Sequence, residues 1–266
     1  MIRDITIGQY YPAYSVIHKL DPRVKLLGTV VYIVTVFFIN DLPGLILATL
    51  ALAGVIKAST VPFKYMIRGL KAIFVLLLFT VGLNMFLTPG EAIFQLGFLK
   101  ITQEGVVLAV QMAIRLVYLI IGSTIMTLTT TPNNLTDGLE KSLGMLKKIH
   151  FPVHELAMTM SIALRFIPIL TDETDKIMKA QQARCADFEN GNLLERIKSL
   201  IPILVPLFIS AIRRANDLAM AMEARCYHGG DGRTKMKPLV YAKRDYIAYA
   251  LMLLYILIWA AIKVWL

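Results

Sequence analysis

Five apolar segments, each bounded by polar or charged residues, most constrain what this chain can fold into. They cover residues 26–39, 45–56, 65–87, 105–128 and 246–264. Hydrophobic residues make up 57% of the 266 residues, and the mean hydropathy is +0.64, whereas soluble domains average about 45–50% apolar residues. The sequence therefore predicts an all-α integral membrane protein with about five transmembrane helices. The first two segments are shorter than the roughly 20 residues that a bilayer core requires.

The basic residues predict how the chain is oriented. Lys and Arg are frequent in the N-terminal arm and between the second and third apolar segments, and sparse in the connections on the opposite side. Because cytoplasmic loops are enriched in Lys and Arg, we expect the N-terminus inside and the C-terminus outside. The net charge of +10 follows this loop distribution, so nucleic-acid binding is not expected. The polar N-terminus also lacks the pattern of a cleavable signal peptide.

The chain divides into three parts on this topology. Residues 1–131 form a membrane domain of four spans, residues 132–245 a cytosolic domain, and residues 246–266 a C-terminal transmembrane helix. The apolar stretches of the cytosolic part, 156–170 and 200–212, have lengths more typical of buried or interfacial helices than of spans. Their apolar halves are expected to lie against the membrane spans and their polar halves to project into the cytosol.

Three helices are predicted in the cytosolic part. The short one covers 134–148, where Pro132 sets its start and Asn133 or Asn134 caps it. The two long ones cover 152–188 and 193–227. Internal prolines are expected to kink both long helices. These prolines are Pro168 in the first and Pro202 and Pro206 in the second.

A short motif occurs twice, once near the end of each long helix. Residues 180–185 (AQQARC) recur 41 positions later as residues 221–226 (AMEARC). The core of the motif is Ala183, Arg184 and Cys185 in the first copy and Ala224, Arg225 and Cys226 in the second. A single arginine there would be explained by favourable interaction with the helix dipole. The repetition favours two arginines that enter two equivalent sockets on a dimeric partner, where a guanidinium forms several charge-assisted hydrogen bonds.

Other polar residues allow two interpretations each. Arg115 lies inside the fourth apolar segment, where a charge is costly, so it is expected to face protein, with Gln111 one turn before it; a functional role and a structural contact are both open. Arg165 and Glu173 lie on roughly the same helix face, as an ion pair or as partner contacts.

Metal binding and catalysis are not expected. Cys185 and Cys226, with His228 nearby, fit no common zinc spacing, and in the cytosol both thiols stay reduced. The chain has no nucleotide-binding P-loop and no hydrolase or metalloprotease motif. A self-contained secondary transporter is the alternative, but it requires a midplane site with broken helices or ionisable residues, and Arg115 alone supports that weakly.

Three groups of residues resemble the T component of energy-coupling factor (ECF) transporters. The N-terminal pattern Ser15-x-x-His18-x-Leu20-Asp21-Pro22-Arg23-x-Lys25-Leu26 is similar to that family's opening signature. The stretch Arg165-Phe166-Ile167-Pro168, followed by Glu173 and Ala180-Gln181-x-Ala183-Arg184, is similar to its most recognisable block. Ala224-Arg225-Cys226 matches the second X-Arg-X motif. Family members often carry glycine where this chain has Cys185.

The resemblance implies a mostly helical membrane protein with a cytosolic coupling domain, in the plasma membrane of a prokaryote. Such a protein bridges two ABC-type ATPases and a separate substrate-binding S component in a vitamin or micronutrient importer. The two X-Arg-X motifs would dock into grooves on the ATPases. Asp21, Pro22, Arg23, Arg165, Pro168 and Glu173 would form a coupling or structural motif. No cofactor is expected on this chain, and ATP and magnesium would bind the partner subunits.

Overall fold

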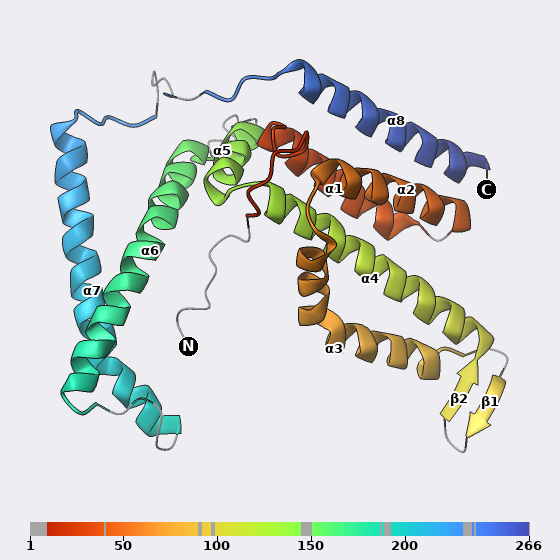
Figure 1. Cartoon of the computed structure of the whole chain (residues 1–266), viewed down its shortest axis with the longest axis horizontal. Helices are drawn as coiled ribbons and strands as arrows, with labels where there is room; N and C mark the ends of the chain where they lie inside the picture. Colours follow the sequence, from red (N-terminus) through yellow and green to blue (C-terminus); the bar gives the residue numbers. More distant parts are fainter. Residues whose placement is uncertain are drawn as a thin grey trace. The chain divides into compact units, whose positions relative to one another are not determined.

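The computed structural model describes residues 10–39, 41–89, 92–96, 99–144, 151–186, 188, 193–230, 236 and 238–265. Within these residues the chain forms two compact units (Figure 1). One unit joins Gly8–Ser142 to Leu239–Leu266, and we call it the bundle unit; the other contains Leu143–Pro238, and we call it the long-helix unit. The junctions between the units therefore follow Ser142 and precede Leu239.

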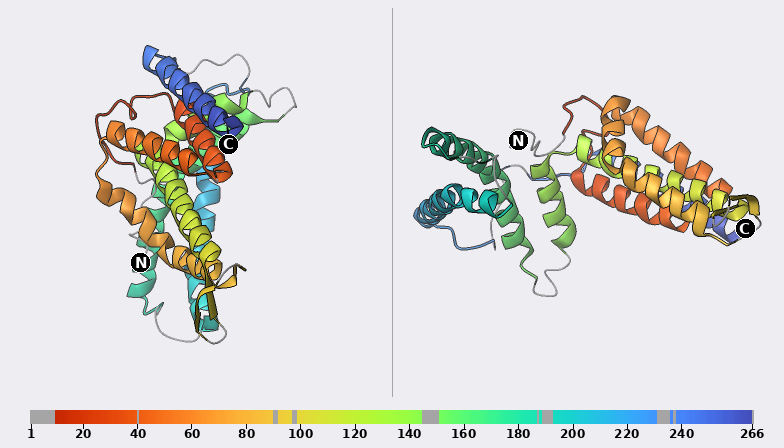
Figure 2. Two further views of the ribbon diagram at one scale, coloured as in Figure 1. Left: turned by 90° about the vertical axis from the view of Figure 1, so that its right-hand side faces the viewer. Right: turned by 90° about the horizontal axis from the view of Figure 1, so that it is seen from below.

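In the residues that the structure describes, the bundle unit contains six helices and a small hairpin. The helices are α1 (Pro22–Phe38), α2 (Leu42–Ser59), α3 (Phe63–Leu87), α4 (Gln103–Thr129), α5 (Pro132–Ser142) and α8 (Lys243–Trp265). Helix α4 is central, because α1, α2 and α3 all pack against it (Figures 1 and 2). Strands β1 (Ala92–Leu96) and β2 (Leu99–Thr102) pair antiparallel between α3 and α4. This hairpin was not predicted from the sequence, and it adds two short strands to a helical membrane protein.

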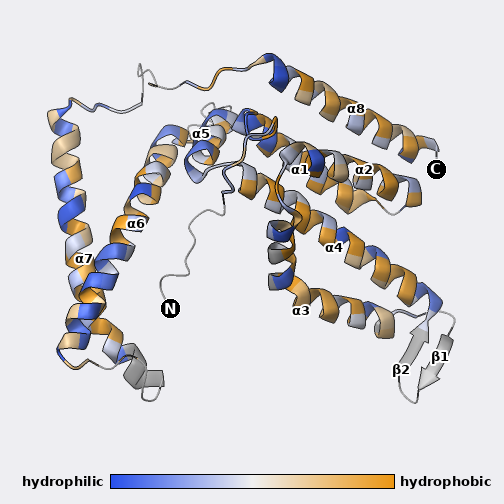
Figure 3. Ribbon diagram, viewed as in Figure 1, coloured by the Kyte–Doolittle hydropathy of each residue, from blue (hydrophilic) through white to orange (hydrophobic). Residues whose placement is uncertain are grey.

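The core of the bundle unit is small, and most of its apolar surface faces outward. Six buried side chains from α2, α3, α4 and the α2–α3 connection form the main cluster: Leu52, Val61, Met66, Ile121, Ile125 and Leu128. Large apolar residues on the outer faces of α3 and α8 are exposed, including Phe74, Phe79, Leu251 and Leu257. Figure 3 shows that hydrophobic residues predominate along both helices. Such an outward apolar surface suits contact with lipid.

Five described helices are long and apolar enough to cross a membrane by length and composition: α2, α4, α6, α7 and α8. Helix α3 adds a sixth if its two halves, which meet at 61°, count as one span. Helices form at all five segments expected from the sequence, although α1, with 17 residues, is the shortest of them. Helices α6 and α7 also meet the length and composition of spans, so their placement in the cytosol remains a prediction.

The long-helix unit is built on α6 (Val153–Ala183) and α7 (Leu193–Ala224), close to the two long helices expected. Helix α6 continues through Pro168, and α7 continues through Pro202 and Pro206. Each proline removes one backbone hydrogen bond of its helix.

The short helix α5 differs from the prediction in where it begins and in which residue caps it, while the predicted end at residue 148 lies outside the described residues. It begins at Pro132 rather than at residue 134, and the Thr131 hydroxyl accepts a hydrogen bond from the Asn134 amide at 3.4 Å, so Thr131 and not the asparagine pair acts as cap. Threonine is among the residues favoured at the N-cap, and proline is favoured at the first helical position. Helix α5 packs on α1 and belongs to the bundle unit. The bundle unit therefore extends through Ser142, and the division between membrane and cytosolic parts at residues 131 and 132 stays a prediction.

Candidate functional site

The first copy of the repeated motif ends α6 in a Schellman motif. The Ala186 amide donates to the Gln181 carbonyl at 3.0 Å, and the Cys185 amide donates to the Gln182 carbonyl at 2.9 Å. Cys185 has a φ of 64°, in the left-handed region. These two reverse hydrogen bonds and a left-handed residue define the Schellman helix end. Arg184 is the C-cap residue at this end.

The second copy ends α7 in the same way. The Tyr227 amide donates to the Met222 carbonyl at 3.1 Å, and the Cys226 amide donates to the Glu223 carbonyl at 2.9 Å. Cys226 has a φ of 54°. Arg225 therefore occupies the same C-cap position as the arginine at the end of α6. The repeat in the sequence is a repeat in three dimensions.

Both guanidinium groups lie on the surface. Arg184 and Arg225 are exposed, as are Ala183 and Ala224 before them. Within the part of the chain that the structure describes, neither arginine side chain has a hydrogen bond or ion pair. Bonding of these side chains to the last carbonyls, the simpler explanation for arginine at a helix end, does not occur here. The Schellman hydrogen bonds already occupy two of those carbonyls at each end.

The two motifs lie at opposite ends of an antiparallel helix pair. Gln181 of α6 donates through Nε2 to the Pro202 carbonyl of α7 at 3.4 Å, and Glu173 pairs with Arg214 further along both helices. The first motif is therefore close to the beginning of α7, and the second lies at its other end (Figures 1 and 2). The stretch of α7 from Pro202 to Arg225 rises about 35 Å as a helix. The two arginines are separated by a distance of that order.

Cysteine is an unusual choice for the left-handed position. A left-handed conformation costs a residue with a Cβ roughly 1–2 kcal/mol, and glycine avoids this cost. We expect Cys185→Gly and Cys226→Gly to raise the free energy of unfolding of the long-helix unit by up to about 1 kcal/mol each and to leave the Schellman helix ends intact. Cys185→Val and Cys226→Val should lower it and displace the neighbouring arginine, because β-branched side chains are strained there. Thermal unfolding, compared between the Gly and Val series, measures this.

The second candidate group, Arg165 and Glu173, is not an ion pair. Glu173 Oε2 instead accepts a hydrogen bond from Arg214 of α7 at 3.0 Å, while Arg165 is exposed and has no partner within the described residues. The Arg214 and Glu173 side chains are 37% and 28% exposed, so the pair contributes at most about 1 kcal/mol. It fixes where α6 and α7 meet. The role of Arg214 was not predicted, because residues far apart in the sequence give no local signal.

The Asp21-Pro22-Arg23 group forms the N-terminal tip of α1. The Asp21 carboxylate accepts hydrogen bonds from the Arg23 amide at 2.9 Å and from its guanidinium at 3.0 and 2.8 Å, and Pro22 is the first helical residue. Asp245, at the start of α8, accepts a hydrogen bond from the Asp21 amide at 2.9 Å. Asp245 was not predicted from the sequence, although an acidic residue in the first turn of a helix is favoured by the helix dipole.

The Asp21 carboxylate makes the stability of the fold depend on pH. Burial alone would raise its pKa, but the hydrogen bonds from Arg23 and the nearby positive charges of Arg23 and Lys25 hold the pKa below its ordinary value. A carboxyl whose pKa is lower in the folded state stabilises the fold above its unfolded pKa, and this contribution is lost as the pH falls through the folded value. We expect thermal stability in detergent to fall on acidification below about pH 4, and to fall less in Asp21→Asn. An equal loss in both proteins would contradict this assignment.

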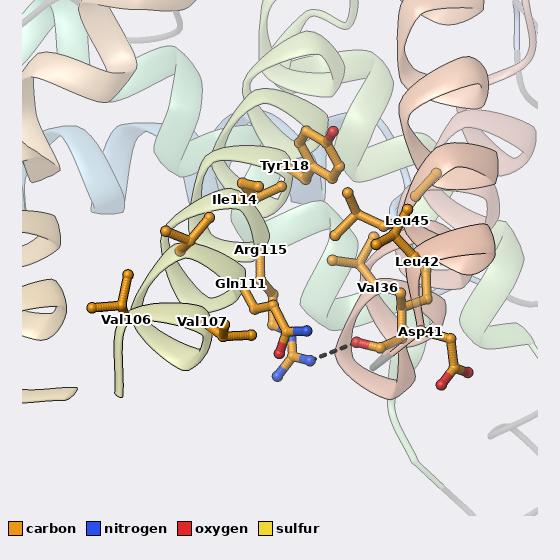
Figure 4. Close-up of a pocket in the computed structure, with 13 residues that line it drawn as sticks. Val36, Asp41, Leu42, Leu45, Val106, Val107, Gln111, Ile114, Arg115 and Tyr118 are labelled. Atoms are coloured by element: carbon orange, nitrogen blue, oxygen red, sulfur yellow. Dashed lines mark hydrogen bonds between the residues drawn. The ribbon is translucent and has the colours of Figure 1, made fainter. Parts of the chain in front are cut away.

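Arg115 caps another helix from the side. Its guanidinium donates to the Ile39 carbonyl at 2.6 Å, at the end of α1 (Figure 4). Gln111 lines the same cavity of about 320 Å³, which is otherwise mostly apolar. Lys263 of α8 donates to the neighbouring Phe38 carbonyl at 3.2 Å. Of the two interpretations of Arg115, the structure supports the structural contact. The Arg115 guanidinium donates to a carbonyl at the end of α1, where the last carbonyls of a helix lack partners within the helix.

The two cysteines lie apart from each other in the described part of the chain. Among the described residues, no three His, Cys, Asp or Glu side chains lie close enough to hold a metal ion. Cys185 and Cys226 are free and exposed, and they belong to opposite ends of the helix pair.

The helical fold and the exposed apolar side chains of its helices define a multi-pass membrane protein. One of its units is built on two paired long helices. Residues 13–236 match the family of cobalt transport proteins. The chain is also 55% identical to the energy-coupling factor transporter transmembrane protein EcfT of Clostridium kluyveri, over 100% of this chain and 99% of that protein. The proteins of the same name from Bacillus subtilis and Lactococcus lactis are 49% and 48% identical, over 92% and 98% of this chain and 92% and 100% of their own lengths.

The chain therefore belongs to the family of energy-coupling factor transporter transmembrane proteins, and it is a T component. The resemblance seen in the sequence motifs is confirmed over nearly the whole length.

Proposed function

We propose that this chain couples two ABC-type ATPases to a membrane-embedded, substrate-binding S component in an importer for vitamins or other micronutrients. The observation that carries the proposal is the pair of matching helix ends, each of which presents one exposed arginine between small residues. Two equal ends on one chain suit two equal sockets, as on a dimer of ATPases. The chain itself has no nucleotide-binding loop, so ATP and magnesium are assigned to the partners.

Arginine suits this docking role better than lysine. A guanidinium is planar and donates in a fixed fork, so it can bond two or more acceptors in a groove at once. Small neighbours, Ala183 and Cys185 in the first copy, let the helix end approach a surface closely. The Schellman geometry fixes the backbone on both sides of the arginine, which reduces the entropy lost on docking. The small neighbours and the Schellman geometry are present at both helix ends.

Helix α7 also carries an apolar face for the S component. Six large apolar side chains in its first half are exposed: Leu200, Ile201, Leu204, Val205, Phe208 and Ile209. An apolar patch of this kind commonly contacts another protein or lipid. On this proposal the α7 face contacts the S component, while the arginine ends contact the ATPases. ATP-driven closure of the ATPases would then move α6 and α7 and reorient the S component.

The secondary-transporter alternative has less support. A second cavity of the bundle unit, about 640 Å³ among α1, α2, α4 and α8, has Lys25 as the one charged residue among the described residues that line it. Its ammonium group already donates to the His18 and Thr129 carbonyls, at 3.2 and 2.9 Å. An ion-coupled transporter would be expected to place unengaged ionisable groups near the midplane.

Purification and reconstitution test the proposal. The chain is co-expressed with its candidate ATPases and S component and extracted in a mild detergent. We expect two nucleotide-binding subunits to remain with each copy of this chain, and substrate uptake in liposomes to require all components and ATP. Uptake by this chain alone, driven by an ion gradient, would overturn the proposal in favour of a secondary transporter.

A further inference from the structure

The two chain segments that flank the long-helix unit both contact the same few residues at the N-terminal end of α1. The long-helix unit begins after Ser142 and ends before Leu239. The chain segment on each side of it belongs to the bundle unit, and each packs on Asp21, Pro22 or Arg23. The contacts below all lie within the bundle unit.

The segment that leads into the long-helix unit is held by close packing. Helix α5 ends at Ser142 and packs along α1. A Cβ placed on Gly138 would lie 2.8 Å from Pro22 Cβ, 3.3 Å from its carbonyl carbon and 3.5 Å from the Arg23 amide. Only glycine allows α5 to approach the tip of α1 this closely.

The segment that leaves the long-helix unit is held by polar contacts. Arg23 donates to the Leu239 carbonyl at 3.4 Å, and its guanidinium lies over the Tyr241 ring, 3.9 Å from the ring centre. Asp245, only 1% exposed, accepts hydrogen bonds from the Ala242 amide at 2.8 Å and from the Asp21 amide at 2.9 Å. One buried carboxylate thus joins the returning segment to the start of α1.

We infer that Asp21, Arg23 and Asp245 are positioning residues that anchor both connections of the long-helix unit to α1, so that movement of α6 and α7 is delivered to the membrane helices. The inference rests on the proposed function, because it needs ATP-driven movement of the long-helix unit. A loosened anchor would let the long helices move without moving α1. ATP hydrolysis would then continue while uptake failed.

Two variants loosen the anchor. Asp245→Asn replaces one of the two acceptor oxygens by an NH₂ group facing a backbone amide, and Arg23→Gln removes the guanidinium from Asp21, Leu239 and Tyr241. Exposed Arg244 provides the matched control Arg244→Gln. In the reconstituted complex we expect hydrolysis within twofold of the unsubstituted value and uptake per ATP at least fivefold lower. The control should change neither.

A gentler pair of variants covers the possibility that the buried changes prevent folding. Tyr241 is exposed, and Tyr241→Leu removes the ring beneath Arg23 while Tyr241→Phe retains it. We expect Tyr241→Leu to lower uptake per ATP at least twofold. Tyr241→Phe should keep uptake per ATP near the unsubstituted value. Hydrogen exchange gives a readout that does not depend on transport: in Asp245→Asn, protection of the Asp21 and Ala242 amides should fall at least tenfold.

Three results would overturn the inference. They are unchanged exchange of these amides, normal uptake per ATP despite lost protection, and a parallel loss of hydrolysis and uptake, which would indicate a merely structural role. A failed proposed function is recognised separately, because the unsubstituted chain would then assemble no ATPases.

Discussion

We expect the double variant Arg184→Ala, Arg225→Ala to abolish ATP-driven uptake while the chain still folds and inserts. Each arginine is exposed at a helix end and has no partner within the described residues, so its removal costs the isolated chain little. In the complex, loss of a docked arginine costs about 2 kcal/mol or more, which corresponds to roughly 30-fold in affinity. Each single variant should weaken ATPase binding without abolishing it, since the remaining motif still holds one subunit. Uptake in liposomes and co-purification of the ATPases measure the effect.

Lysine variants separate docking from simple charge. Arg184→Lys and Arg225→Lys keep the positive charge beside the helix dipole but lose the fork that bonds two acceptors. We expect both to transport poorly, between the unsubstituted protein and the alanine variants. Normal transport by both lysine variants would favour a dipole effect alone. Assembly and wild-type uptake by the double alanine variant would refute the docking assignment.

A change in the spacing of the motifs should be nearly as damaging. Four residues inserted in α7 after Ala219 move Arg225 by about 6 Å along the helix and turn it by about 40°, whereas seven residues move it by about 10 Å on nearly the same face. The insertion site follows Arg214, so the contact with Glu173 is kept. If the two sockets of a dimer have a fixed separation, each insertion variant can dock one of its two motifs but cannot dock both at the same time. We expect uptake to fall at least tenfold in each.

The matched control carries the same four residues between β1 and β2, at Gly97. This insertion lengthens a connection without altering α7, and uptake should stay near the unsubstituted value. Normal uptake in both α7 variants would mean that the two motifs need no fixed distance, and the two-socket account would then be wrong.

Local patterns predicted the helices well. Apolar runs of 12 to 24 residues fix helix positions in a membrane protein, since every backbone group must be bonded within the chain, and α6 and α7 end within about five residues of the predicted positions. The twin motif was visible because identical residues recur at the same place in two helices. The left-handed cysteines give that pattern a physical basis.

Contacts between distant segments could not be predicted. Glu173 bonds Arg214 rather than Arg165, and Asp245 bonds Asp21, 224 positions away. Neither pairing leaves a period or spacing in the sequence, because it depends on how whole helices pack. The hairpin between α3 and α4 was missed for another reason. Its strands have five and four residues, too few for an alternating pattern to stand out.

Orientation in the membrane remains a prediction from the Lys and Arg distribution, and labelling can check it. In a background with Cys185→Gly and Cys226→Gly, an impermeant thiol reagent added outside should modify Leu42→Cys and not Lys57→Cys. Both positions are exposed and lie at opposite ends of α2. The reverse pattern would invert the topology.

A cryo-EM map of the purified complex tests the central claim most directly. It should show Arg184 and Arg225 in grooves of two different nucleotide-hydrolysing subunits, separated by a distance on the order of 35 Å. A map in which both guanidinium groups face lipid or the exterior, away from any ATPase, would contradict the account.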